Sequence, residues 1–233
     1  MERWRALAAS SGLRDADPLG EALIAAYAAP HRRYHGLAHV AFLLDEIDRR
    51  QALARDPALL RFAAWFHDAI YDPLASDNEA RSANWARRDL VAHGMDSGAA
   101  AAVAALIGKT KSHHAGAATP DEALFLDMDF AILGADREVY AAYADNIRAE
   151  YAAVAPDAFR AGRASFLKGV LAALARIISE NEGDILNIRT VRRESDFFDL
   201  VFDIEVADTR RLAHILAAMR ASKSVRAADR VRG

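Results

Sequence analysis

Two pairs of side chains in the N-terminal part of the sequence have types and a spacing that suit a metal ion. His35 and His39 are four positions apart, so on a helix they would share one face. His67 and Asp68 are adjacent and follow a run of apolar residues. Because burying such a pair without a partner is costly, we expect His39, His67 and Asp68 to hold a divalent metal ion. A carboxylate from further along the chain would complete the site.

This donor set suits a divalent ion that activates water. Two imidazoles and two carboxylates suit Mn²⁺, Fe²⁺, Co²⁺, Ni²⁺, Zn²⁺ or Mg²⁺. An ion with open coordination positions polarises a phosphoryl oxygen and lowers the pKa of a bound water toward ~7. Such an ion would give a hydroxide able to attack phosphorus.

Three strings carry a resemblance to a known family, namely Tyr34–His39, Ala64–Asp72 and Asp77–Ala83. In this order and with these gaps they resemble the HD superfamily of metal-dependent phosphohydrolases. The match is closest to its bacterial family of predicted metal-dependent HD phosphohydrolases and extends over about residues 20–170. The resemblance implies an all-helical bundle with a divalent metal ion, bound by the second histidine, the His-Asp pair and a later aspartate.

The resemblance also implies roles for individual side chains. Where the superfamily has two histidines four apart, the second binds metal and the first protonates the leaving group. His39 is then the expected ligand and His35 the expected general acid. The last ligand is Asp129 or Asp127, and the sequence context of Asp129 fits the superfamily slightly better. Gly36 stands where cyclic-nucleotide phosphodiesterases have an asparagine.

Five further side chains are candidates for the same site. Glu79 is expected to orient or deprotonate the attacking water, with a helix cap or an ion pair as the alternative. His113 and His114 occupy the place where two-metal HD proteins have extra histidines; a second ion, a phosphate contact and plain surface positions remain open. Lys109 and Arg148 are candidates for binding substrate phosphate, or for surface charge and ion pairs.

Helices must position these side chains, because apolar residues recur with helical spacing along most of the sequence. Prolines and glycines mark where the helices begin and end. The expected helices cover residues 3–9, 18–29, 36–53, from 57 through the His-Asp pair, 78–92, 97–109, 120–133 and 137–154, and one more begins near Pro156. Asp77 is expected to cap the helix that follows it. We therefore expect a mainly α fold.

From about residue 184 the pattern becomes that of a small α+β module. Residues 185–194 look extended, 198–206 alternate between apolar and polar, 212–219 keep helical spacing, and 224–232 could form a last strand. We place the boundary between residues 165 and 180, which gives domains 1–170 and 171–233.

Five strings in this region carry a second resemblance: Gly169–Ala172, Ile178–Ile185, Asn187–Arg189, Asp203–Asp208 and Val225–Val231. They resemble an ACT domain, most closely that of the Rel/Spo (p)ppGpp synthetase/hydrolases. An ACT domain normally begins with a strand, but Ser165–Gly169 occupy that place. We expect the first strand to be missing or improvised and the two family patterns to share a helix. An incomplete sheet has an unpaired edge, which favours a homodimer through this part.

The composition limits which cellular compartment and which partners are expected. The chain has 233 residues, 53% of them apolar, and no cysteine, which excludes a disulfide framework and thiol chemistry. A net charge of −3 gives no reason to expect nucleic acid as a partner. The sequence has neither the pattern of a signal peptide nor an apolar run long enough for a membrane span. We expect a cytoplasmic protein with no membrane partner.

Three functions are consistent with these patterns. The first is a metal-dependent phosphohydrolase acting on a nucleotide or another small phosphorylated metabolite. The second is a (p)ppGpp-type pyrophosphohydrolase, because an HD-like site precedes a Rel/Spo-like ACT module. The third is a non-catalytic metal-binding regulatory protein with an ACT-derived interaction module. Loss of activity with a chelator, or in His67→Ala, separates the first two from the third.

Overall fold

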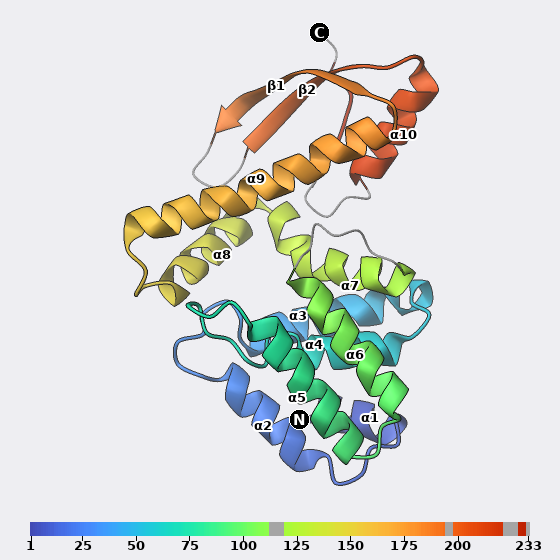
Figure 1. Ribbon diagram of the computed structural model, residues 1–233, viewed down its shortest axis with the longest axis vertical. Helices are drawn as coiled ribbons and strands as arrows, with labels where there is room; N and C mark the ends of the chain where they lie inside the picture. The colour runs from blue at the N-terminus through green and yellow to red at the C-terminus, as the bar shows by residue number, and fades with distance from the viewer. Residues whose placement is uncertain (112–118, 194–197, 221–227, 232–233) are drawn as a thin grey trace. The chain divides into compact units, whose positions relative to one another are not determined.

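The computed structural model describes residues 1–111, 119–193, 198–220 and 228–231 (Figure 1). The chain forms two compact units, Met1–Asp129 and Phe130–Gly233. The expected fold class is confirmed, because the described part of the first unit is helical and the second unit adds a small sheet. The domain boundary at residue 170 stays a prediction; it falls inside one long helix.

The helices of the first unit agree closely with the predicted ones. They are α1 (Glu2–Ser10), α2 (Asp17–Tyr27), α3 (Leu37–Arg50), α4 (Pro57–Phe66), α5 (Asn78–Ala92), α6 (Ser97–Thr110) and α7 (Pro120–Phe130). A 3-10 helix (Gln51–Leu53) follows α3 and another (Ala131–Gly134) follows α7. The predicted helices over 36–53 and 120–133 are therefore each an α-helix that ends in a tighter turn.

Aspartates precede α4 and α5, but only one of them caps its helix. The Asp56 carboxylate accepts a hydrogen bond from the Leu59 N–H, and Pro57 stands in the first turn of α4, where no N–H partner is needed. Asp77 precedes α5, yet its side chain makes no cap hydrogen bond. The expected capping by the Asp77 carboxylate is therefore wrong.

Trp4 of α1 lies at the centre of the first unit's core and is fully buried. Its ring meets the rings of Phe62, Trp65 and Phe66 edge to face, at centroid distances of 6.1, 5.7 and 6.2 Å. Gly20 allows this close packing, since a Cβ there would lie 2.2 Å from Trp4 Cδ1. The aromatic cluster fixes α4, the helix that leads into two of the predicted metal ligands.

His35 and His39 do not share a helix face, contrary to the expectation from their spacing. Helix α3 begins at Leu37, after Gly36 in an extended conformation with φ −113° and ψ −170°. His35 therefore lies in the turn before α3, while His39 lies in its first turn. The two side chains are presented to the same region from a turn and from a helix.

The His67-Asp68 pair lies just past the end of α4 rather than within it. The helix ends at Phe66, and His67 is the C-terminal cap residue with helical φ and ψ. Asp68 follows in a turn. Carbonyl groups at a helix C-terminus have no partner within the helix, so other groups must bind them here.

The second unit contains three helices and two strands in its described part. They are α8 (Arg137–Glu150), α9 (Pro156–Glu180), β1 (Asp184–Arg193), β2 (Phe198–Glu205) and α10 (Thr209–Arg220). Helix α9 is continuous for 25 residues and runs through the place of the first ACT strand (Figure 1). Of the predicted last strand 224–232, residues 228–231 are not in a strand and the others lie outside the described residues.

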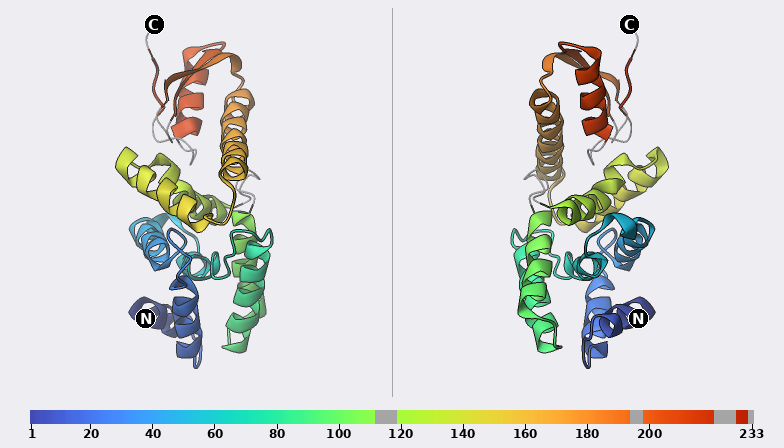
Figure 2. Two further views of the ribbon diagram at one scale, coloured as in Figure 1. Left: turned by 90° about the vertical axis from the view of Figure 1, so that its left-hand side faces the viewer. Right: turned by 90° about the vertical axis from the view of Figure 1, so that its right-hand side faces the viewer.

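Strands β1 and β2 form an antiparallel pair, with Ile185 opposite Ile204 and Ile188 opposite Phe202. Ile185, Phe202 and Ile204 pack against a small core to which α9 and α10 contribute. Figure 2 shows the ribbons of these two helices and the two strands from two sides. Ile178 and Ile215 are the fully buried members of this core. Within the described ranges, none of the helices is both long and apolar enough to cross a membrane.

Candidate metal centre

Three helices of the first unit bring their donor atoms together at one point. His39 comes from α3, His67 from the end of α4, and Asp129 from the last turn of α7. His39 Nε2 lies 3.1 Å from His67 Nε2 and 3.1 Å from Asp129 Oδ1, and His67 Nε2 lies 3.6 Å from Asp129 Oδ1. These separations match those between neighbouring ligands of one ion at about 2.1 Å.

Asp68 joins this group from the same turn as His67. Its Oδ2 lies 3.0 Å from His67 Nε2. The side chains are 1% (His67), 2% (His39), 12% (Asp129) and 19% (Asp68) exposed, so the donors are shielded and the two carboxylates face the outer side. The structure thus brings three of the four predicted ligands, His39, His67 and Asp129, together at one point. Asp68 lies beside them in contact with His67, and this donor set fits a divalent ion.

A backbone hydrogen bond sets the orientation of the His67 ring. His67 Nδ1 lies 3.1 Å from the Ala64 carbonyl, which requires the proton on Nδ1. Nε2 then faces His39 and Asp129 and is the nitrogen that would bind an ion, as in metal sites where a second hydrogen bond fixes the tautomer. The Phe125 ring meets the imidazole edge to face at 5.9 Å and restricts its rotation.

In the metal-free protein, the buried side chains of His67 and Asp68 stabilise each other's charged form. Burial by itself lowers the pKa of His67, but the charges of Asp68 and Asp129 outweigh burial and raise the pKa to about 9. Burial also opposes ionisation of Asp68, yet the charges of His67 and His35 hold the pKa of that carboxyl well below its usual range. The carboxylate of Asp68 is therefore ionised at neutral pH and favours the binding of a cation beside it.

Asp121 anchors the helix that carries Asp129. Its carboxylate accepts hydrogen bonds from the N–H groups of Arg55 and Asp56, at 2.8 and 2.9 Å, at the start of α4. Asp121, Phe125 and Asp129 are spaced four apart and so share one face of α7. The group of donors that converges in the described residues includes Asp129 and not Asp127.

The aromatic rings around His35 place it beside the four donors. Its ring centroid lies 6.2 Å from that of His39, 5.0 Å from Tyr34 and 4.3 Å from Tyr71. The side chain is half-buried. His35 is therefore near the candidate metal centre without being one of the converging donors.

The other predicted site residues are scattered over both units. Glu79 lies in the first turn of α5 and Lys109 in the last turn of α6, and both are half-buried. Arg148 belongs to the second unit, where it donates to the carbonyls of Tyr151 and Val154 at 2.6 and 3.2 Å. Its guanidinium thus binds the end of α8, which stops at Glu150 rather than at 154. The predicted sites His113 and His114 lie outside the described residues.

The sequence patterns did not identify the side chains that support the His-Asp turn. Asn78 accepts from the Asp72 N–H and donates to the Asp72 carbonyl, at 3.1 and 2.7 Å. The fully buried Ser82 accepts from the Ile70 N–H and donates back to its carbonyl. The spacing of Asn78 and Ser82, one helical turn apart in the Asp77–Ala83 string, was the available signal.

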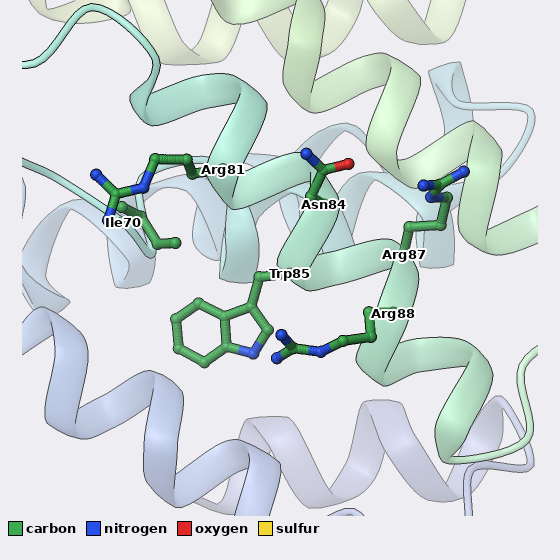
Figure 3. Close-up of a pocket in the computed structure, with 6 residues that line it drawn as sticks. All are labelled: Ile70, Arg81, Asn84, Trp85, Arg87 and Arg88. Atoms are coloured by element: carbon green, nitrogen blue, oxygen red, sulfur yellow. The ribbon is translucent and has the colours of Figure 1, made fainter.

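A separate hollow of about 560 Å³ lies along α5 (Figure 3). Ile70, Arg81, Asn84, Trp85, Arg87 and Arg88 line it. Trp85 Nε1 and the Arg88 guanidinium both donate to the Asp89 carboxylate, so one acidic side chain orders both. None of the three converging donors lines this hollow, and neither does Asp68, so the hollow is distinct from the candidate metal centre.

Comparisons with known proteins support the resemblance of the C-terminal part to an ACT domain. The family model described as "ACT domain" matches residues 166–230. A stretch of 65 residues is 38% identical to "GTP pyrophosphokinase rsh" of Brucella ovis and of Brucella suis, and 37% identical to that of Brucella abortus. These matches cover 28% of the chain and 9% of each relative. No solved structure matches the chain.

The match begins inside α9 and includes both strands and α10. The predicted ACT domain and its likeness to a Rel/Spo-type protein are therefore confirmed, with helix in place of the first strand. The resemblance of the first unit to the HD superfamily stays a prediction.

Proposed function

We propose that this protein is a metal-dependent phosphohydrolase that acts on a nucleotide or another small phosphorylated metabolite. The observation that supports this most is the convergence of two imidazole nitrogens and one carboxylate in a shielded place, with the Asp68 carboxylate 3.0 Å from one of these imidazoles. A bound divalent ion would supply a Lewis acid for a phosphoryl oxygen and a water of lowered pKa.

The residues of the chain have separate tasks in this proposal. His39 and His67 hold the ion through Nε2, and Asp68 and Asp129 hold it through carboxylate oxygens. His35, in the turn beside them, donates a proton to the leaving oxygen. Glu79 orients the attacking water. Lys109 is the remaining candidate for substrate phosphate, because Arg148 already binds carbonyls of its own unit.

A narrower candidate is hydrolysis of the pyrophosphate of (p)ppGpp. It is favoured by the ACT domain match and by the likeness to proteins described as GTP pyrophosphokinases. These findings support a link to (p)ppGpp metabolism. The matched stretch is only 9% of each relative's length. The proposed hydrolytic activity is therefore argued from the metal centre of the first unit and not from this match.

The test combines metal analysis with a substrate panel. The purified full chain is stripped with a chelator and reconstituted with Mn²⁺, Fe²⁺, Co²⁺, Ni²⁺, Zn²⁺ or Mg²⁺ in turn. Release of phosphate and pyrophosphate is then measured from ordinary nucleotides and from ppGpp. We expect at least one ion per chain, lost in Asp68→Ala, and turnover that depends on it.

Each outcome has a distinct meaning. Preference for ppGpp over ordinary nucleotides supports the narrower candidate, and the reverse rejects it. Metal binding without turnover of any substrate indicates the third function, a metal-binding regulatory protein. A folded chain with neither metal nor turnover contradicts the proposal.

A further inference from the structure

Arg32 joins two segments that meet at the candidate metal centre. One of its terminal nitrogens, Nη1, donates to the His35 carbonyl at 2.9 Å and to the Asp68 carbonyl at 2.6 Å. The other, Nη2, donates to the Ala69 carbonyl at 2.8 Å. A single guanidinium therefore links the turn that carries His35 to the turn that carries Asp68.

Two aromatic rings hold this guanidinium in place. Arg32 Cζ lies 5.0 Å from the ring centroid of Tyr27 and 5.5 Å from that of Tyr71. Such contacts suit a planar, delocalised cation. Lysine would keep the charge but could not donate to three carbonyls with this fixed geometry.

Arg32 supplies hydrogen-bond donors to carbonyl groups just past the end of α4. The Asp68 and Ala69 carbonyls follow the last residue of the helix, where partners within the helix are lacking and a cation is favoured. Tyr27 completes the support, because its hydroxyl accepts from the Asp68 N–H at 3.2 Å. The backbone of Asp68 is thus held on both sides, by Tyr27 at its N–H and by Arg32 at its carbonyl.

We propose that Arg32 is a positioning residue of the metal centre, an inference that rests on the proposed function. It fixes the Asp68 turn so that the carboxylate reaches the ion, and it fixes the His35 turn beside it. It does so through backbone carbonyls.

The experiment uses Co²⁺ as the probe and the full chain in each case. Wild type, Arg32→Lys, Arg32→Met and Asp68→Ala are stripped of metal and titrated with Co²⁺ against a competing chelator. The visible absorption of bound Co²⁺ reports which ligands surround it. We expect both Arg32 variants to bind Co²⁺ 10–100-fold more weakly, as for other groups that orient a ligand. The spectra of the Co²⁺ that they bind should differ from the wild-type spectrum, because Asp68 no longer reaches the ion, and Asp68→Ala gives the signal without bound ion.

Arg3→Lys is the matched control. Arg3 also links two elements of the first unit, since it pairs with Asp45 at 2.5 Å and Asp48 at 2.6 Å on α3, the helix that carries His39. Its loss should leave the Co²⁺ affinity and spectrum unchanged. Circular dichroism confirms that each variant is folded, and Arg32→Lys carries the test where Arg32→Met does not fold.

The results separate this inference from the proposed function. If wild type binds Co²⁺ and both Arg32 variants bind it equally well with the wild-type spectrum, the positioning role is rejected while the metal centre stands. If wild type binds no Co²⁺, the proposed function fails and the inference fails with it. Weaker binding with an unchanged spectrum also rejects the role, because Asp68 would then still be a ligand.

Discussion

Asp129 Oδ1 lies 3.1 Å from His39 Nε2, although 90 positions separate the two residues in the sequence. This contact favours Asp129 over Asp127 as the last ligand. We predict that Asp129→Asn weakens metal binding by more than the roughly 10–100-fold loss typical of supporting residues. Asp127→Asn should retain the ion. Metal content after dialysis checks both variants, and the reverse result would assign the ligand to Asp127.

The anchor of α7 gives a second prediction. Asp121→Ala removes a buried carboxylate that accepts two backbone hydrogen bonds, so the free energy of unfolding should fall by about 2–4 kcal/mol. Metal affinity should fall as well, because α7 carries Asp129. Urea unfolding and a competitive metal titration measure the two effects.

Asp96→Ala is the control for this effect. The Asp96 carboxylate also accepts two backbone N–H groups, from Gly98 and Ala99 at the start of α6. Its loss should cost about 1 kcal/mol of stability and leave metal affinity unchanged. Equal losses of affinity in the two variants would show a general effect of instability.

Much of this arrangement could be predicted from the sequence, and the rest depends on tertiary contacts. Helix α4 follows from its Asp-Pro start and apolar spacing, which also place the His-Asp pair at its end. The choice between Asp127 and Asp129 is different, because residues two apart cannot be ordered by type alone. Asp121 and Phe125, eight and four positions before Asp129 and so on the same helix face, held that information.

The sequence patterns could not predict the role of Arg32. Its contacts form only when the turn before α3 meets the end of α4, 36 positions further along. Sequence periodicity does not predict a contact of this kind. An arginine in a loop is ordinarily expected to lie on the surface as an exposed cation. The roles of the four donors as metal ligands still rest on the experiments above.

The raised pKa of His67 predicts how pH affects the metal-free protein. Its folded-state pKa is about 9, above the value of about 6.5 expected in the unfolded chain. The resulting stabilisation is complete below pH of about 6.5 and is lost as the pH rises through about 9. Relative to His67→Gln, wild type should lose roughly 2–3 kcal/mol of unfolding free energy between these limits.

Urea unfolding of the stripped proteins at both pH values measures this difference. Saturation with Co²⁺ should remove it, because the ion then replaces the proton between His67 and the carboxylates. Parallel pH profiles for wild type and His67→Gln would contradict the charge coupling in this centre.

The two-stranded sheet predicts self-association through the second unit. In the part of the chain that the structure describes, β1 pairs only with β2, and Leu186 and Ile188 on β1 are 66% and 39% exposed. An open edge with exposed apolar side chains favours pairing with another copy, and a charge there opposes it. Sedimentation should show a homodimer, weakened at least about tenfold by Leu186→Lys, or about 1.4 kcal/mol. Val139→Lys, at a 54% exposed apolar position on α8, should dimerise like wild type. A wild-type chain that stays monomeric at all concentrations would reject the edge as an interface.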